Sequence, residues 1–155
     1  MTDTSILYTI GYSKLSINTL FEIIETLNIK RLIDVRTTPY SRFRAQNFDR
    51  TNLKRALPNI YRHEPSLGGK TGQRGPKWNW GLSRIITRLN EYGNVAIMCL
   101  ERDPNQCHRM WIANDLQRRE DFKFKIVHLS PPQENTGRYY TASLNTHKID
   151  DWFDL

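Results

Sequence analysis

The chain lacks several features that would assign its class directly. Of its 155 residues only two are cysteines, so the disulfide framework of small secreted domains is not expected. No apolar run approaches the roughly 20 residues that span a bilayer, and the first residues, MTDTSILYTIGYS, have no basic start followed by a long apolar stretch. We therefore expect no membrane segment and, by default, a cytoplasmic location.

Metal ligands are also scarce. Cys99 and Cys107 alone do not supply the four ligands of a structural zinc site. Adding Glu101 and His108 completes a set of four on paper, but the spacing matches no common zinc pattern. We expect neither a metal nor another cofactor.

Acidic residues are few relative to basic ones. The chain has 23 Lys and Arg against 16 Asp and Glu, a net charge of +7 and a pI of about 9.6. This balance favours phosphate-bearing partners, although many soluble domains are basic without binding nucleic acid. Hydrophobic residues at 38% and charged residues at 25% are typical of one globular domain.

Short apolar segments alternate with amphipathic ones along the chain. The predicted strands are 6–10, 32–35, 60–63, 95–100 and 123–129, and the predicted helices are 16–27, 49–57, 82–92 and 103–119. This alternation predicts a single α/β domain over residues 1–155, with a mostly parallel sheet and helices on both faces in a Rossmann-like three-layer arrangement. The tail from about residue 130 is polar with scattered aromatic residues, and its sequence favours no particular element.

The segment from Val95 to Leu100 is continuously apolar, as a central strand of a parallel sheet should be. The helix that follows has a clear start signal. Asp103 is a suitable N-cap, Pro104 fits the first helical position, and Gln106 follows three residues after the cap. The register of this helix is therefore well defined by the sequence.

In that register Arg109 lies on the same stripe as Ile112, Ala113 and Leu116, which should face the sheet. A guanidinium keeps its charge, so a buried one needs an anionic or hydrogen-bonding partner. Two alternatives are open for Arg109. It binds a ligand anion near the helix start, or it pairs with Asp34 or Glu101 and ties helix to strand.

Four separated segments carry a family resemblance. They are YTIGYS at the first strand, LIDVR with Pro39, Ser41 and Arg42 after it, His63-x-Pro65-x-Leu67-Gly68-Gly69, and MCLERDPNQCHR. With these segments the chain resembles the domain-of-unknown-function family DUF488 from residue 8 to about 128. The resemblance implies a fold class and a map of motifs, and it implies no reaction.

A fainter resemblance is to the rhodanese pattern, in which an Asp-x-Arg strand precedes a catalytic cysteine at the end of a later strand. LIDVR would supply the first part and Cys99 the second. Rhodanese-type loops cradle an anion with a short turn that usually contains glycine. Here Leu100, Glu101 and Arg102 follow Cys99, with no glycine.

Candidate site residues follow the predicted strands, where ligands of parallel sheets bind. The candidates for substrate binding are Tyr12, Ser13, Arg36, Ser41, Arg42, His63 and Arg109. If the sheet is parallel, we expect Tyr12, Arg36, Arg42, Glu101 and Arg109 to line one cavity.

Four further residues are candidates for catalysis, namely Glu101, Asp34, Cys107 and His108. Glu101 follows a strand end, where a carboxylate can act as acid, base or nucleophile, or can pair with a neighbouring arginine. Asp34 lies within an apolar strand and either takes part in the chemistry or accepts hydrogen bonds from loop amides. Cys107, beside His108 in the first turn of the predicted helix, is either an activated thiol or packed in the core, whereas Cys99 is expected to be an inert core thiol.

Residues 64–81 form a predicted loop rich in glycine, basic and aromatic residues. Within it Lys70, Arg74, Lys77 and Trp78 are candidates for contact with nucleic acid, because cations can bind phosphates while aromatic rings stack on bases. The alternative is a solvated loop whose tryptophans pack back on the body of the domain.

Taken together, the sequence predicts an enzyme that acts on a phosphate-bearing substrate, a nucleotide or a nucleic acid. Glu101 is the predicted reacting carboxylate, and cleavage of a base–sugar bond is one chemically coherent version. One alternative is a non-catalytic nucleic-acid-binding module. The other is thiol chemistry of the rhodanese or phosphatase kind. The sequence does not indicate an oligomeric state.

Overall fold

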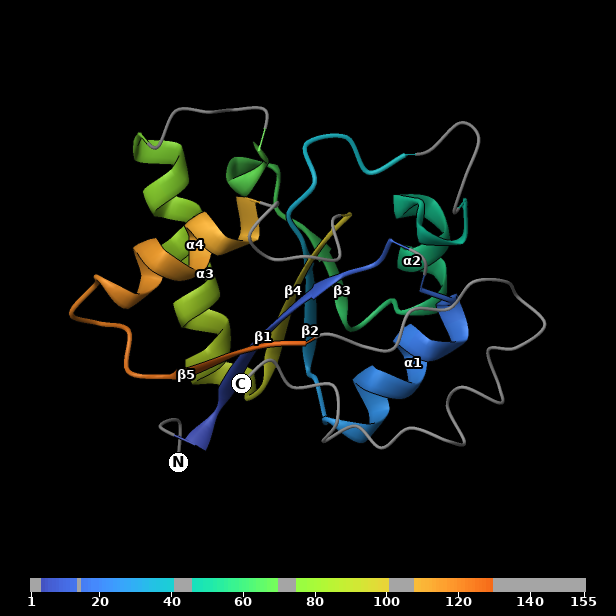
Figure 1. Cartoon of the computed structure of the whole chain (residues 1–155), viewed down its shortest axis with the longest axis horizontal. Helices are drawn as coiled ribbons and strands as arrows, with labels where there is room; N and C mark the ends of the chain where they lie inside the picture. Colours follow the sequence, from blue (N-terminus) through green and yellow to red (C-terminus); the bar gives the residue numbers. More distant parts are fainter. Residues whose placement is uncertain (1–3, 14, 41–45, 70–74, 101–107, 130–155) are drawn as a thin grey trace.

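A five-stranded parallel sheet forms the centre of the molecule (Figure 1). The computed structural model describes residues 4–13, 15–40, 46–69, 75–100 and 108–129. The strands are β1 (Ile6–Gly11), β2 (Arg31–Asp34), β3 (Tyr61–His63), β4 (Val95–Cys99) and β5 (Lys125–His128). They are arranged in the order β3-β2-β4-β1-β5, so β4 lies in the middle, as its apolar sequence predicted.

Helices cover both faces of the sheet. They are α1 (Ile17–Thr26), α2 (Arg50–Ala56), α3 (Pro76–Tyr92) and α4 (His108–Gln117), with short 3₁₀ turns η2 (Gln46–Phe48) and η3 (Pro65–Leu67). Figure 1 shows α3 and α4 on one side of the sheet and α1 and α2 on the other. The predicted single-domain α/β fold with three layers is confirmed.

Two hydrophobic clusters hold the layers together. Successive residues of a strand point to opposite faces, so Leu7 packs in the cluster beneath α3 and α4 while Tyr8 packs in the cluster beneath α1 and α2. Likewise Ile97 lies in the first cluster and Met98 in the second, both with 0% exposure. This alternation decides on which face each polar side chain of the sheet lies.

Helix α1 begins where its sequence indicates, and the buried side of α4 is the one its sequence indicates. Ser16 caps α1 by accepting a hydrogen bond from the Thr19 amide at 3.0 Å, as expected of a serine N-cap. In α4 the predicted stripe is confirmed, because Arg109 is buried together with the apolar residues of that stripe. The described part of α4 begins at His108, and the predicted helix start at Asp103 lies outside the described residues.

The prediction of a loop up to residue 81 was wrong, because α3 already begins at Pro76. Gly75 precedes it in an extended conformation and the proline occupies the first turn, where its missing N–H leaves no bond unmade.

Gly81 lies inside this helix for a packing reason. A Cβ there would stand 2.5 Å from Ser66 Oγ and 2.8 Å from Leu67 Cγ, so only glycine allows η3 to approach α3 this closely.

Glu64, which is not among the predicted site residues, strengthens the same contact. Its carboxylate is buried and lies 2.8 Å from Arg84 Nε and 3.4 Å from Arg88 Nη1. It also accepts a hydrogen bond from Ser66 Oγ at 2.8 Å. The segment after β3 is thereby fixed to α3 by charge as well as by packing.

None of the described helices is long and apolar enough to cross a membrane.

Candidate functional site

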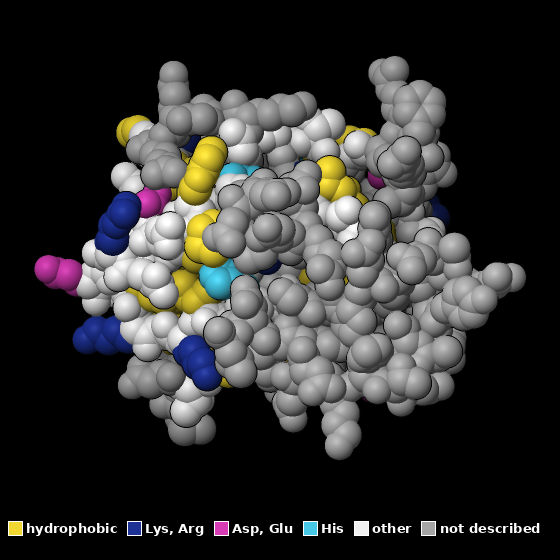
Figure 2. All heavy atoms as spheres, in the orientation of Figure 1, with side chains coloured by type: hydrophobic (Ala, Val, Ile, Leu, Met, Phe, Trp, Pro, Cys, Tyr) yellow, Lys and Arg dark blue, Asp and Glu magenta, His cyan; other side chains and the backbone are white. Residues whose placement is uncertain are grey.

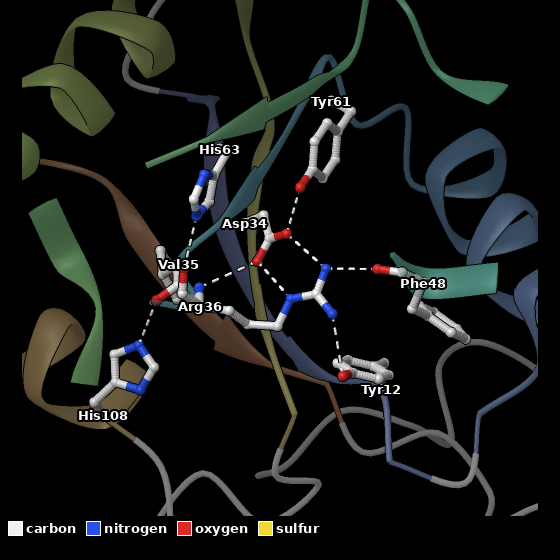
Figure 3. A network of polar contacts seen from close by, with 8 residues as sticks. All are labelled: Tyr12, Asp34, Val35, Arg36, Phe48, Tyr61, His63 and His108. Carbon is white, nitrogen blue, oxygen red and sulfur yellow. Dashed lines mark hydrogen bonds and ion pairs between the residues drawn. The ribbon is translucent and has the colours of Figure 1, made fainter. Parts of the chain in front are cut away.

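A buried polar network lies where β2 ends (Figure 3). Asp34 has no solvent exposure, and its carboxylate accepts hydrogen bonds from the Arg36 amide at 3.1 Å, from Arg36 Nε at 2.8 Å and from Arg36 Nη2 at 2.7 Å. The Tyr61 hydroxyl, which is not among the predicted site residues, donates to the same carboxylate. Asp34 therefore fits the structural alternative, since it accepts bonds from a loop amide and two side chains.

Arg36 is occupied by the protein itself. Besides Asp34 it donates to the Phe48 carbonyl at 2.5 Å and to the Tyr12 hydroxyl at 3.1 Å, so four of its five N–H groups are used. Burial alone would lower the pKa of Arg36, but the hydrogen bonds and charge of Asp34 raise it above its usual value. With 8% exposure, Arg36 has a structural partner in place of the ligand anion that the sequence suggested.

Tyr12 and Tyr61 complete this network. Burial, followed by the neighbouring Asp34 carboxylate, raises the pKa of Tyr61, so this hydroxyl stays protonated and can donate. The Tyr12 ring stacks on Phe48 with centroids 4.5 Å apart. The network joins the carboxyl ends of β1 and β2 to Tyr61, the first residue of β3, and leaves Tyr12 buried rather than presented to a ligand.

Two histidines approach the backbone of the same segment from the other side (Figure 3). His63 Nε2 lies 2.7 Å from the Arg36 carbonyl, and His108 Nε2 lies 2.8 Å from the Val35 carbonyl. Since a carbonyl can only accept, both rings carry a proton on Nε2. These two contacts therefore fix the tautomer of each neutral imidazole.

The environment of His108 favours its neutral form. Burial lowers the pKa of His108, and the Arg109 charge acts in the same direction, while the Val35 carbonyl and Asp34 partly oppose it. Its imidazole is therefore neutral near pH 7. A neutral imidazole with a fixed tautomer is suited to act as a general base.

Gly68 and Gly69 pack closely on this region. A Cβ on Gly68 would stand 2.2 Å from Thr37 Oγ1, and a Cβ on Gly69 would stand 3.0 Å from His108 Nδ1. A Cβ would overlap Thr37 at position 68 and would press on His108 at position 69, so the glycine pair lets backbone lie close to both residues. His63, Gly68, Gly69 and His108 from the motifs are thus brought together around the exit of β2.

Arg109 lies elsewhere. It has no solvent exposure, and its Nη1 donates to Thr9 Oγ1 at 2.7 Å. Thr9 Oγ1 in turn lies 2.6 Å from His128 Nδ1 on the neighbouring strand. A buried guanidinium thus connects α4 to β1 and β5.

The expected convergence into one cavity is not found among the described residues. Tyr12 packs in the cluster beneath α1 and α2 and bonds Arg36, whereas Arg109 lies on the stripe of Ile112 beneath α4. Arg109 and Tyr12 lie on opposite faces of the sheet. Arg109 binds Thr9, and Thr9 points to the face opposite that of its neighbour Tyr8, which packs in the same cluster as Tyr12. The position of a residue after a strand predicted the edge of the sheet at which it lies, but it did not predict on which face its side chain lies.

Other candidates have different outcomes. Ser13 is half-buried, and its amide donates to the Leu100 carbonyl at 2.8 Å, which joins the exits of β1 and β4. Six candidates lie outside the described residues, namely Ser41, Arg42, Lys70, Arg74, Glu101 and Cys107.

Cys99 differs from the inert thiol that we expected, because it is bonded in a disulfide. A disulfide sulfur is not the thiolate that nucleophilic chemistry needs. The rhodanese-like hypothesis requires Cys99 to be the nucleophile, and the disulfide-bonded Cys99 is not one.

Trp78 is not available for stacking on a base. It is only 3% exposed, packs in the cluster beneath α3 and α4, and its Nε1 donates to Asp115 Oδ2 at 2.9 Å. The alternative that the tryptophans pack back on the body is correct for this residue. Lys77 precedes it on the exposed side of the first turn of α3.

Within the described ranges, no three His, Cys, Asp or Glu side chains come together in a way that could hold a metal ion.

Comparison with known families agrees with these motifs. Residues 16–79 match DUF488, a domain of unknown function. The DUF488 resemblance is thereby confirmed, and the matched segment contains β2, β3, η3 and the Gly68–Gly69 pair. YTIGYS and MCLERDPNQCHR lie outside it, so their assignment to the family rests on the sequence resemblance. No curated protein and no solved structure matches the chain.

Proposed function

We propose that the chain is an enzyme that acts on a phosphate-bearing substrate, a nucleotide or a nucleic acid, at the carboxyl edge of the sheet around the exit of β2. The observation that supports this most is the pair of imidazoles on consecutive carbonyls, His108 on Val35 and His63 on Arg36. Acid–base catalysis needs proton carriers whose tautomer and position are fixed before substrate binds.

The surroundings of the two histidines suit such a site. The Asp34–Arg36 network fixes the backbone whose carbonyls hold the rings, because both side chains are buried and bonded. Gly68 and Gly69 allow a close backbone approach beside Thr37 and His108. An excess of seven positive charges attracts phosphate-bearing molecules to the surface as a whole.

Glu101 is our candidate for the reacting carboxylate, since it follows β4 within two residues. In the version in which a base–sugar bond is cleaved, this carboxylate stabilises the oxocarbenium-like sugar and water supplies the hydroxyl. A neutral imidazole takes the proton that the attacking water releases, and the same proton can then pass to the departing base. The C–N bond breaks with its electron pair on the base, so the reaction is a hydrolysis and needs no further reagent.

The test is turnover on defined probes. We would incubate the protein with nucleoside 5′-monophosphates and with mixed-sequence single-stranded DNA and RNA oligonucleotides, and identify products by chromatography and mass spectrometry. Free base as product would support base–sugar cleavage, and shortened strands would indicate hydrolysis of phosphodiesters. Absence of any product across these probes between about pH 6 and 8, the range where histidine titrates, would overturn the proposal.

Variants then locate the activity. Gln at position 63 or 108 keeps an N–H donor toward the carbonyl but does not titrate, so turnover should fall by about 10²- to 10⁴-fold with little change in thermal stability. Glu101→Ala should abolish turnover if this is an enzyme and should leave affinity intact if the chain only binds nucleic acid. Full turnover by His63→Gln and His108→Gln would remove the histidines from the mechanism.

A further inference from the structure

A basic pocket lies against helix α2 and Tyr40 of the loop that leaves β2. It has a volume of about 390 Å³ and is lined by Tyr40, Arg50, Thr51, Lys54 and Arg55. The Arg50 amide donates to the Pro39 carbonyl at 2.9 Å, and this hydrogen bond fixes the start of α2 to the loop that carries Tyr40. Figure 1 shows the start of this loop at the end of β2.

The charge in this pocket is of one sign. Arg50 and Lys54 stand four residues apart on α2, as do Thr51 and Arg55, so the four side chains form neighbouring rows on one helix surface. Leu53, with no exposure, faces the core, whereas all three cations are exposed. In the part of the chain that the structure describes, none of the three is in an ion pair, and no carboxylate lines the pocket.

The pocket also offers an aromatic face. Tyr40 is 54% exposed, although a ring of this size is usually covered in a folded domain. Its partners in the lining are the cations and Thr51 rather than apolar side chains. Cations beside an exposed ring are the combination with which proteins hold a single strand, the cations binding phosphates and the ring stacking on a base.

We propose that this pocket binds a single-stranded polynucleotide, with Arg50, Lys54 and Arg55 on successive phosphates and a base stacked on Tyr40. The proposal rests on the proposed function and narrows its substrate to a strand rather than a mononucleotide. Asp34, the last residue of β2, is six residues before Tyr40. The pocket is therefore close along the chain to the candidate site. Duplexes do not fit the proposal, because their bases are stacked inside and cannot reach the ring.

The test is direct binding of a fluorescent single strand about 12 nucleotides long, in DNA and RNA versions, followed by anisotropy between about 50 and 200 mM salt. The first variant neutralises the pocket as Arg50→Gln, Lys54→Gln and Arg55→Gln together. Three phosphate contacts should contribute a slope of about −2 to the dependence of log affinity on log salt. The triple variant should lose that part of the slope and bind at least about tenfold more weakly at the lower salt concentration.

A matched control removes the same charge elsewhere. Lys30, Lys123 and Lys125 are exposed, and none of them lines the pocket. Figure 2 shows Lys and Arg side chains on the left of the molecule, where α4 and β5 lie in the same orientation in Figure 1. Joint replacement of the three lysines by Gln should leave both affinity and salt slope close to wild type. Equal weakening by the two triple variants would mean that only net charge acts and would overturn the pocket.

The stacking contact has its own variants. Tyr40→Ala should weaken binding on the order of tenfold without changing the salt slope, since stacking releases no counterions. Tyr40→Phe, which keeps the ring, should bind like wild type. A duplex that binds as tightly as the single strand, with no effect of Tyr40→Ala on either, would overturn the proposal of a single strand.

Failure of this proposal is distinguishable from failure of the proposed function. If the triple pocket variant binds and turns over oligonucleotides like wild type while His108→Gln is inactive, the pocket is wrong and the enzyme stands. If the pocket variants lose binding but wild type yields no product, the pocket stands and the enzyme proposal is wrong. Circular dichroism melts confirm that each variant is folded before it is scored.

Discussion

Replacing Asp34 with Asn tests how much the network at the end of β2 contributes to the fold. The change keeps the size of the side chain but removes the charge that balances Arg36, which is 8% exposed and 2.7 Å away. Breaking a buried ion pair by removing one partner costs about 3–5 kcal/mol, because the other charge stays buried without compensation. That is a large share of the roughly 5–15 kcal/mol that stabilises a single domain.

The assay is urea unfolding followed by circular dichroism. With an m-value of about 2 kcal/mol/M, a loss of about 4 kcal/mol moves the midpoint down by about 2 M. The chain provides a matched control in Asp121, which pairs with Arg119 at the same spacing of two residues, but with 54% exposure. Asp121→Asn should change the free energy of unfolding by less than about 1 kcal/mol, as exposed pairs do.

A double variant separates charge balance from shape. Asp34→Leu together with Arg36→Met removes both charges and should recover stability relative to Asp34→Asn, because no buried charge is then left alone. If Asp34→Asn shifts the midpoint no more than Asp121→Asn, the network is not a stabilising element. It would then also not hold the Val35 and Arg36 carbonyls in place for the two histidines.

Three further outcomes are expected. The pKa of His108 is lowered in the folded state, so the unfolded state binds its proton first, and stability should fall as the pH drops below about 6.5; His108→Gln should flatten that part of a pH series of urea midpoints. Trp78→Phe removes the hydrogen bond to Asp115 and should cost about 1–2 kcal/mol in thermal or urea unfolding, yet leave oligonucleotide affinity unchanged because Trp78 is buried. Gly81→Ala places a methyl 2.5 Å from Ser66 Oγ and should lower stability by about 1–3 kcal/mol, whereas an unchanged melt would show that η3 does not pack on α3 as described.

The sequence predicted the sheet well because its signals there are local. The apolar run from Val95 identified the central strand, and the spacing of Arg109 with Ile112 identified the buried side of α4. The start of α3 was missed although Gly75 and Pro76 are a recognisable start signal, because the surrounding glycines and cations suggested a loop.

The site was harder to predict because it depends on contacts between distant segments. That Asp34 would pair with Arg36 rather than with Arg109 depends on how the chain turns after β2, which residue types do not specify. The same holds for Tyr61, 27 positions from Asp34. Residue types at strand ends identified the edge of the sheet where polar groups gather, and packing decided which of them meet.

The strand order also determines when the sheet can form during synthesis. In the described sheet β1 pairs with β4 and β5, and β2 pairs with β3 and β4, so β4 is the strand that joins the two halves. A nascent chain that ends before Val95 has made β1, β2 and β3 but lacks the strand between the first two. The segment that matches DUF488, residues 16–79, also lacks β4, and it lacks β1 as well. Cooperative folding must therefore wait until β4 has left the ribosome, and the many long-range pairings through β4 make that folding slow relative to a helical bundle of equal length.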